Sequence, residues 1–346
     1  MSRHILITGG AGFLGTHLSR SFRRVGVQVR LLDLEGSAGG PRDPGVEYVG
    51  GDVRDPRVMA DALDGVDVVV HAAFASPRQP AELIRSVNVG GMRSVCEQAL
   101  IRGVRRVIVI SSAIVANQAR THPLFRDSPL TRLDLYRASR VEAEALAGEY
   151  ARRGLSVAIV RPKTLVGPER VAAFAIVFEW IRLGRPVVVL GSGRNRYQLL
   201  DARDLGEGIR LLAGSAAPGV FSFGAATFRS VREDLQTLLD HARTGARLHF
   251  IPGRAALVGL RAMELANLVP LSEWHYMSAR GEDSTVDISR AERELGWRPE
   301  RSNTQSLVEA YDWYVESWNA TGAARSTHPV PLAHRALKCL TWLLQR

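Results

Sequence analysis

A tyrosine and an arginine near the middle of the chain have the types and the spacing to move a proton. Tyr136 and Arg140 lie four residues apart in "LDLYRASRVEAEAL" (133–146), which reads as a helix, so we expect their side chains to share one face. A permanent cation beside a phenol favours the ionised form of the phenol. The run "VIVISS" ends at Ser112, which can donate to a developing oxyanion. These three groups suffice to oxidise or reduce a secondary alcohol when a redox cofactor carries the hydride.

Alternating strand and helix patterns in the first half of the chain predict the scaffold that positions these residues. Compact apolar runs of this kind are typical of strands buried on both faces of a parallel sheet. We therefore expect an α/β protein with a doubly wound parallel Rossmann sheet, whose crevice opens at the carboxyl ends of its strands. The strands are expected at 4–9, 27–33, 46–52, 66–73, 106–112 and 155–162, and helices at 13–25, 81–102 and 136–153.

The pattern of predicted helices and strands changes after Pro162. Helical patterns then alternate with short strand candidates and Gly/Pro turns, which predicts a smaller mixed α/β domain for the substrate. We expect a cofactor domain at 1–165, a substrate domain at 166–320, and a linker with an amphipathic tail at 321–346 that docks on its own protein or on a second subunit. The later helices are expected near 170–183, 204–213, 230–243, 254–268 and 305–318, with 204–213 packing back on the first domain.

A glycine-rich turn at the start of the chain predicts a dinucleotide site. Gly9, Gly12 and Gly15 in "ILITGGAGFLGTHL" directly follow a strand and open a helix. The first glycine allows a sharp turn, the second a close approach of the backbone to a pyrophosphate, and the third close packing of helix on strand. Free amides at the helix N-terminus can then hold the phosphate charge.

Acidic residues at two later strand ends predict which dinucleotide is bound. Asp33 ends "VQVRLLD", where a carboxylate accepts hydrogen bonds from the adenosine ribose and repels a 2′-phosphate, so NAD is favoured over NADP. Asp52, in "GGDVRD", suits the adenine amino group. Ala72 and Ala73, in "HAAF", are expected to line the cofactor trough, with His71 a satisfied core histidine rather than a catalyst.

Taken together, these motifs resemble the extended short-chain dehydrogenase/reductase family, in its NAD-dependent epimerase/dehydratase branch. The resemblance runs from Ile5 to about Trp318 and depends on "TGGAGFLG", "GDVRD", "HAA", "VNVGG", "VISSA", "YRASRVEAE", "RPKTLVGP" and "VDISRAERELGWRP". It implies that Ser112, Tyr136 and Arg140 are catalytic and that Asn88 steadies the helix and water network beside them. The cofactor contacts it implies are Gly9, Gly12, Phe13, Leu14, Gly15, Asp33, Asp52, Val53, Ala72, Ala73, Asn88, Ser111, Tyr136, Arg140 and Pro162.

Arg140 is a departure from the family, which has a lysine there that contacts the nicotinamide ribose. Arginine keeps the charge and can donate to two groups, but it does not release a proton. The chain holds only two lysines, Lys163 and Lys338, so a general preference for arginine makes the exchange plausible. As a hypothesis, Lys163 in "RPKT" supplies the missing ammonium; the alternative is an exposed side chain.

The substrate motifs depart further from the family. Thr164 stands where relatives that act on sugar nucleotides have an asparagine, Arg196 keeps a position that often contacts the diphosphate, and Arg280 in "ARGED" is the clean match to a later arginine. With Lys163, these are the expected substrate-binding residues. The apolar stretch 256–277 instead resembles the substrate region of 3β-hydroxysteroid dehydrogenase-like relatives.

Three functions remain open on this sequence. The first is an NAD-dependent epimerase or oxidoreductase on a nucleotide-activated sugar, 4-epimerase-like, and the second is a dehydrogenase on a hydrophobic alcohol such as a steroid. The third is a catalytically silent NAD-binding protein. Dehydratase chemistry is disfavoured because Ala113 and Ile114, after Ser112, cannot move a proton.

Composition and charge limit the classes of molecule that the protein is expected to bind. The net charge of +10 comes from 45 basic and 35 acidic residues, but the arginines are scattered and no nucleic-acid motif accompanies them, so we expect anionic small molecules and no nucleic acid. Two cysteines give neither a disulfide framework nor a metal-ligand spacing, and no apolar run could span a membrane. The first strand begins too early for a signal peptide, so a cytoplasmic protein is expected, and no metal is expected. The family resemblance implies a homodimer that forms through helices 81–102 and 136–153.

Overall fold

The structure is a computed structural model that describes residues 4–37, 45–77, 79–115, 132–170, 174–265 and 273–321. The chain divides into two compact units. Unit 1 is made of the described part of 1–163 together with 202–223 and 287–298, and unit 2 of 164–201, 224–286 and the described part of 299–346. The expected C-terminal tail lies outside the described residues. In the part that the structure describes, no helix is both long enough and apolar enough to cross a membrane.

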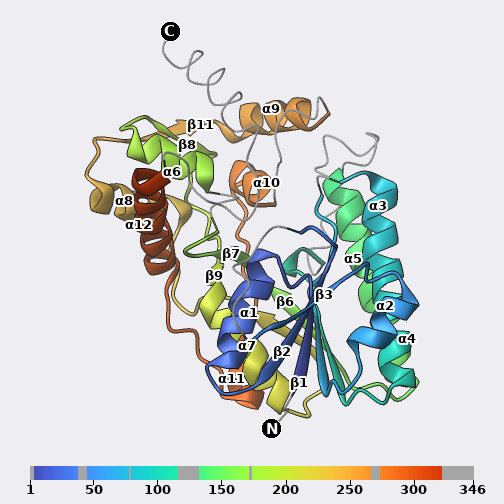
Figure 1. The fold of residues 1–346 in the computed structure, drawn as a ribbon. Helices are drawn as coiled ribbons and strands as arrows, with labels where there is room; N and C mark the ends of the chain where they lie inside the picture. The colour runs from blue at the N-terminus through green and yellow to red at the C-terminus, as the bar shows by residue number, and fades with distance from the viewer. Residues whose placement is uncertain are drawn as a thin grey trace. The chain divides into compact units, whose positions relative to one another are not determined.

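Unit 1 is built on a seven-stranded sheet in which every neighbouring pair is parallel, which confirms the expected fold class. Its order is β10-β6-β5-β4-β1-β2-β3, so strands β2 and β3 are added on one side of β1 and the later strands, from β4 onward, on the other side. The sheet is drawn in Figure 1, where β1, β2 and β3 are labelled. The strands are β1 (His4–Thr8), β2 (Gln28–Asp33), β3 (Glu47–Gly50), β4 (Val68–His71), β5 (Arg106–Ile110), β6 (Val157–Pro162) and β10 (Gly219–Phe223).

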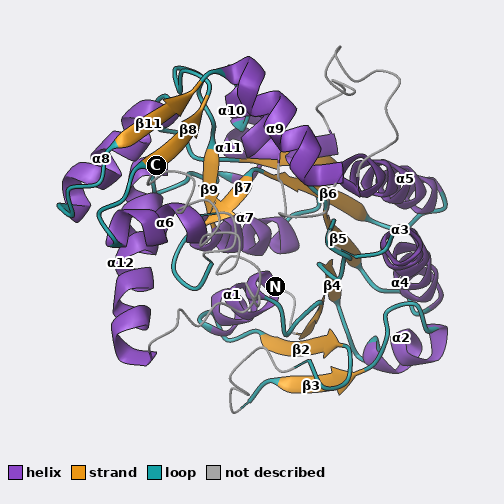
Figure 2. Cartoon of the chain, turned by 90° about the horizontal axis from the view of Figure 1, so that it is seen from above, coloured by secondary structure: helices purple, strands orange, loops and turns teal. Residues whose placement is uncertain are grey.

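Helices cover both faces of this sheet (Figure 2). One face carries α1 (Phe13–Arg23) and α7 (Ala202–Gly214), which contact each other. The other face buries its apolar side chains beneath α2, α4 and α5, and α11 contacts β10 and α7. The remaining helices of the unit are α2 (Pro56–Ala62), α3 (Ala81–Arg85), a π-helical turn (Ser86–Gly90), α4 (Gly91–Ile101), α5 (Arg132–Arg152) and α11 (Ser289–Leu295).

Unit 2 combines two small parallel pairs of strands with helices. Aromatic rings of α6 and α12 meet in its core, where Phe178 lies 5.8 Å from Tyr311 and 5.9 Å from Tyr314, measured between ring centroids. The strand pairs are β7 (Thr164–Val166) with β9 (Leu199–Asp201), and β8 (Val187–Leu190) with β11 (Leu248–Ile251). The helices are α6 (Ala175–Arg182), α8 (Val231–Ala242), α9 (Gly253–Leu265), α10 (Glu273–Arg280) and α12 (Asn303–Thr321).

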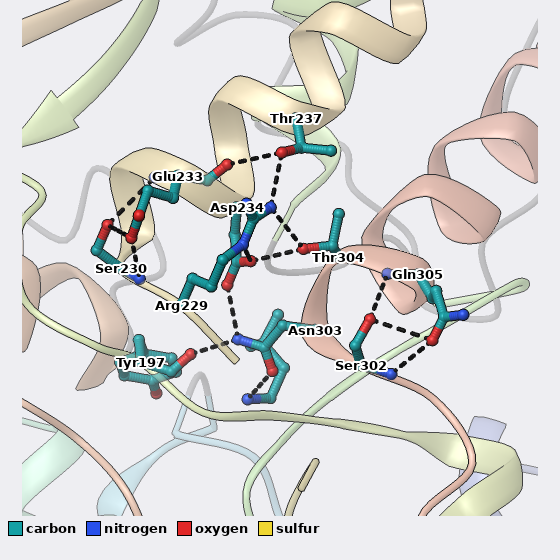
Figure 3. A network of polar contacts seen from close by, with 11 residues as sticks. Tyr197, Arg229, Ser230, Glu233, Asp234, Thr237, Ser302, Asn303, Thr304 and Gln305 are labelled. Carbon is teal, nitrogen blue, oxygen red and sulfur yellow. Dashed lines mark hydrogen bonds and ion pairs between the residues drawn. The ribbon is translucent and has the colours of Figure 1, made fainter. Parts of the chain in front are cut away.

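A polar network holds the beginnings of α8 and α12 together in unit 2 (Figure 3). The buried carboxylate of Asp234 accepts hydrogen bonds from Thr304 Oγ1 (2.6 Å) and Asn303 Nδ2 (3.0 Å). The same Asn303 amide donates to the carbonyl of Tyr197, just before β9, and Ser230 caps α8 in a capping box with Glu233. Buried polar groups that are all paired in this way fix the register of the elements they join.

Candidate active site

The glycine turn between β1 and α1 has the close backbone contacts that a dinucleotide cradle requires. Gly9 has φ +69°, a left-handed conformation, and a Cβ there would lie 2.8 Å from the carbonyl oxygen of Ala72. A Cβ on Gly15 would lie 2.5 Å from the carbonyl oxygen of Gly10. Gly12 is the N-cap of α1, has no side-chain cap, and no acid occupies the first turn. The residues therefore fit a pyrophosphate, because the helix amides stay accessible to an anion.

Asp33, at the end of β2, is bonded to this glycine turn. Its Oδ2 accepts a hydrogen bond from the backbone N of Ala11 (2.9 Å), and Oδ1 accepts from the backbone N of Leu34 (2.8 Å) and from Ser37 Oγ (3.1 Å). The carboxylate thus stands beside the turn in a fixed orientation, as a ribose-binding acid would. Its contact with a ribose remains a prediction.

Asp52 lies two residues beyond the end of β3. The sequence pattern predicts a longer strand that ends at Asp52 itself. Its carboxylate accepts hydrogen bonds from the Nε (3.0 Å) and Nη2 (2.5 Å) of Arg54, which hold the pKa of Asp52 below its usual range. Neighbouring Val53 is buried and fills the space beside Gly91, where a Cβ would lie 2.9 Å from Val53 Cγ2. An adenine contact by Asp52 would therefore involve a carboxylate that Arg54 already binds.

His71, the last residue of β4, is fully buried beside the tyrosine–arginine pair. Its Nδ1 lies 2.8 Å from Thr8 Oγ1, and its ring contacts Phe74 with a centroid distance of 4.7 Å. Burial, and then the charge of Arg140, lower the pKa of His71 from 6.5 to about 3. The imidazole therefore stays neutral near pH 7, and this adds no second cation to the site.

The two serines after β5 lie at the carboxyl edge of the sheet, as expected from the order of the strands. Ser111 is 4% exposed, and Ser112 is half-buried with an oxygen that accepts a hydrogen bond from the backbone N of Ile114 (3.3 Å). That bond uses the Ser112 oxygen as an acceptor, so its O–H can still donate to a substrate oxygen. Ala113 and Ile114 are buried in a short 3₁₀ turn.

Tyr136 and Arg140 face each other on α5, as their spacing predicts. The guanidinium donates two hydrogen bonds to the phenol oxygen of Tyr136, from Nε (3.0 Å) and Nη2 (2.7 Å). Its Nη1 donates to the carbonyl of Ile110 at the end of β5 (2.8 Å), and only 8% of Arg140 is exposed. A largely desolvated cation that donates twice to one phenol oxygen stabilises negative charge on that oxygen.

Asn88 links this helix to the chain after β4. It lies in the π-helical turn, accepts from the backbone N of Ala75 through Oδ1 (2.8 Å), and donates from Nδ2 to Ser139 Oγ (2.8 Å). Ser139 in turn donates to the carbonyl of Tyr136 (2.7 Å). The sequence analysis missed Ser139, although its place three residues after the tyrosine was the available signal.

A buried ion pair fixes α5 against β6. Arg161 donates from Nε (3.0 Å) and Nη2 (2.5 Å) to the carboxylate of Glu144, and this carboxylate raises the pKa of Arg161. Pro162 ends β6, and Lys163 follows with 4% exposure and its backbone N bonded to the carbonyl of Phe223 (2.9 Å). Lys163 is thus buried rather than exposed, and its proposed role as a second ammonium remains a prediction.

The expected substrate residues of unit 2 are each engaged within that unit. Thr164 Oγ1 lies 2.8 Å from the hydroxyl of Tyr197. Arg196 pairs with Asp283, which accepts from the Arg196 backbone N (2.7 Å) and Nε (2.9 Å), and Arg280 Nε lies 3.0 Å from Glu282 Oε2.

Both arginines that were expected to bind substrate are therefore paired with carboxylates of one short segment. Asn195 Nδ2 donates to the carbonyl of Glu282 (3.1 Å), so this segment lies beside the residues before β9. Asp283 was not expected at the site because its partner Arg196 lies 87 positions away, whereas Glu282 lies two residues from Arg280. The sequence analysis also missed Phe74, whose ring lies under the guanidinium of Arg140.

Comparisons with known proteins identify relatives of this chain. The profile of the NAD dependent epimerase/dehydratase family matches residues 5–224. The chain is 33% identical over 344 residues to the uncharacterized protein y4nG of Sinorhizobium fredii, covering 98% of this chain and 86% of that protein. It is 30% identical over 330 residues to sterol demethylase protein B of Methylococcus capsulatus, covering 90% and 98%.

The solved UDP-glucose 4-epimerase of Thermotoga maritima, with UDP-glucose, is similar to this chain with a TM-score of 0.71 and 20% identity. The likeness covers 91% of this chain and 99% of that one. At this level of identity, it shows that the two proteins share a fold.

Proposed function

Because the chain belongs to the NAD-dependent epimerase/dehydratase family, we propose that it transfers a hydride at a secondary alcohol or its ketone. The proposed substrate is a nucleotide-activated sugar, handled in the manner of a 4-epimerase. Tyr136 exchanges the hydroxyl proton, Arg140 supports the charge on Tyr136, and Ser112 donates to the substrate oxygen.

The observation that carries this proposal is the pair of hydrogen bonds from Arg140 to the phenol oxygen of Tyr136. They answer the main objection to an enzyme with arginine in place of lysine, which is that the cation could point away from the tyrosine. With the guanidinium in this position, a tyrosinate can accept the proton of a substrate hydroxyl that lies next to it.

The chain's own residues fit NAD at the glycine turn. Gly9, Gly12 and Gly15 would let the backbone amides approach the pyrophosphate, and Asp33 would accept from the ribose hydroxyls. NAD, when bound, supplies the hydride chemistry. The carboxylate of Asp33 disfavours a 2′-phosphate, which supports NAD over NADP.

Two observations support a nucleotide-activated sugar. The net charge of +10 favours an anionic substrate, and a structural neighbour of the same fold binds UDP-glucose. The proposed binding residues are Lys163, Thr164, Arg196 and Arg280.

A hydrophobic alcohol, such as a sterol, is the second candidate, and a specific observation favours it. Asp283 and Glu282 pair with Arg196 and Arg280, so neither arginine offers an uncompensated charge to a diphosphate. The similarity to sterol demethylase protein B, at 30% identity, points the same way.

We further propose a homodimer in a reducing cytoplasm. Ile101 on α4 and Val141 on α5 are apolar and 65% and 47% exposed, as they would be on helices that pack against a second copy. Cys96 is buried, and burial raises the pKa of its thiol to about 12, so the thiol stays protonated.

Cofactor retention and product analysis test this function together. We expect purified protein to carry NAD and to convert a UDP- or dTDP-sugar to its epimer without releasing reduced cofactor. Stoichiometric release of NADH with a hydrophobic alcohol would select the second candidate. The absence of turnover with both classes, despite bound NAD, would reject the proposal.

A further inference from the structure

Three groups surround the guanidinium of Arg140. Tyr136 and the Ile110 carbonyl accept its hydrogen bonds at its edge, and the ring of Phe74 covers one of its flat faces. The guanidinium carbon lies 3.6 Å from the centroid of the Phe74 ring, which is direct contact and well inside the range of a cation–π interaction.

Phe74 is itself held in place. It follows β4, and the backbone on one side of it is bonded to Thr8 Oγ1 through the N–H groups of Ala72 (3.2 Å) and Ala73 (3.3 Å). On its other side, the backbone N of Ala75 donates to Asn88 (2.8 Å). The ring also packs on the neutral imidazole of His71 and on the core beneath α4 and α5.

A flat support matters for an arginine in a way that it does not for a lysine. The guanidinium is planar, and its donors reach partners only within its plane, while its faces are weakly hydrated and stack on aromatic rings. Both Nε and Nη2 can reach the single oxygen of Tyr136 only if that plane contains the oxygen. The ammonium group of a lysine is not planar, so it does not need a flat support to orient its donors.

We propose that Phe74 is a positioning residue that sets the plane of the Arg140 guanidinium, so that two of its N–H groups converge on the Tyr136 oxygen. Through this contact, an arginine takes the place of the lysine beside the tyrosine. The inference deepens the proposed function and depends on it for its catalytic meaning. In this proposal, Phe74 acts on the proton transfer through Arg140.

Phe74→Leu removes the aromatic face and keeps an apolar side chain. We expect the phenolate absorbance of Tyr136 at a given pH to fall, because the guanidinium no longer directs both N–H groups at the phenol oxygen. This absorbance is measured in the near UV without any substrate, as the difference between each protein and its Tyr136→Phe counterpart. Turnover under saturating NAD and substrate should fall in parallel, with little change in KM.

Two further variants separate positioning from packing. Phe74→Tyr restores the flat face and should recover most of the loss, which also covers the case that Phe74→Leu folds poorly. In an Arg140→Lys background, Phe74→Leu should have a clearly smaller effect, because no plane has to be set. Equal effects in the two backgrounds would overturn the proposal.

Phe250→Leu is the matched control. Its ring lies under another arginine of this chain, with the Arg232 guanidinium carbon 5.2 Å from the ring centroid, in unit 2. It should leave both the Tyr136 signal and turnover unchanged. A phenolate signal that depends on Phe74 without turnover on any substrate would support the positioning and reject the proposed function. A signal that Phe74→Leu leaves unchanged in folded protein would overturn the inference.

Discussion

Arg140 in unit 1 and Arg196 in unit 2 use the same side chain in opposite ways. Arg140 is 8% exposed and donates to a phenol and a carbonyl, and among the described residues no carboxylate forms an ion pair with it. The Arg196 side chain is 59% exposed and is paired with Asp283, whose pKa is held below its usual range by hydrogen bonds from the Arg196 backbone and side chain.

This difference distinguishes the arginine proposed for proton transfer from the arginine proposed for substrate binding. An unpaired, desolvated cation keeps its field available for the tyrosinate that a hydride-transfer site needs. A surface arginine that already has a carboxylate attracts a diphosphate less strongly. Under the proposed function, the proton-transfer groups Tyr136 and Arg140 contact each other within unit 1. The arginines proposed to bind substrate in unit 2 are already paired with carboxylates.

Replacing Arg140 should give the largest effect, because it removes the charge from unit 1. Arg140→Met keeps the length of the side chain and is expected to lower kcat roughly 100- to 1,000-fold, the range for loss of a preorganised charge-stabilising donor. Arg140→Lys keeps the charge and should recover part of the activity. Steady-state kinetics at saturating NAD decide this, and wild-type turnover by Arg140→Met would refute the role of the cation.

Burial, and then the charge of Arg140, lower the pKa of His71, so unit 1 should be sensitive to acid. The folded-state pKa of His71 is about 3 against 6.5 when exposed, so between these values only the unfolded chain binds the proton. The free energy of unfolding should therefore fall as the pH drops below 6.5, by at most about 1.4 kcal/mol per pH unit from this group.

The variant His71→Asn should flatten that dependence, measured by urea unfolding between pH 7 and pH 4, whatever it does to stability at pH 7. The exposed His249 of β11 provides the control, since His249→Asn should leave the slope as in wild type. Identical slopes for His71→Asn and wild type would contradict the account of this histidine.

Removing the carboxylate of Asp283 tests whether its pairing with Arg196 weakens the binding of a nucleotide. Asp283→Asn leaves the Arg196 charge uncompensated while keeping an acceptor for its hydrogen bonds. We expect UDP or dTDP to bind roughly threefold to tenfold more tightly, and with a steeper dependence on salt. Isothermal titration calorimetry measures both.

The control is Asp312→Asn, which removes the same charge from the exposed pair with His241, elsewhere in unit 2. It should leave nucleotide affinity unchanged. If Asp283→Asn behaves like this control, Arg196 is not a nucleotide-binding residue, and the hydrophobic-alcohol candidate gains.

The sequence predicts local features of this protein well. The compact apolar runs predict six strands of the sheet because buried parallel strands have a distinct composition. The four-residue spacing of Tyr136 and Arg140 predicts their shared face because helix geometry is nearly invariant.

Contacts between distant segments could not be predicted in this way. Strand β10 was missed because "GVFSF" is only a five-residue run, at the edge of the sheet. The pairing of Arg196 with Asp283 joins residues 87 positions apart, and the contact of Phe74 with Arg140 depends on where a loop crosses a helix. Such contacts arise from tertiary packing, for which neither periodicity nor motif carries a signal.

The most direct test follows the nicotinamide absorbance after NAD-loaded protein is mixed with a UDP-sugar or a hydrophobic alcohol. For at least one class, the wild type should reduce the nicotinamide at least about 100-fold faster than Tyr136→Phe when both proteins are saturated with NAD. Equal rates for the two proteins would contradict the assignment of Tyr136. Neither reduced nicotinamide nor epimerised product with either class would leave a protein that binds NAD without chemistry.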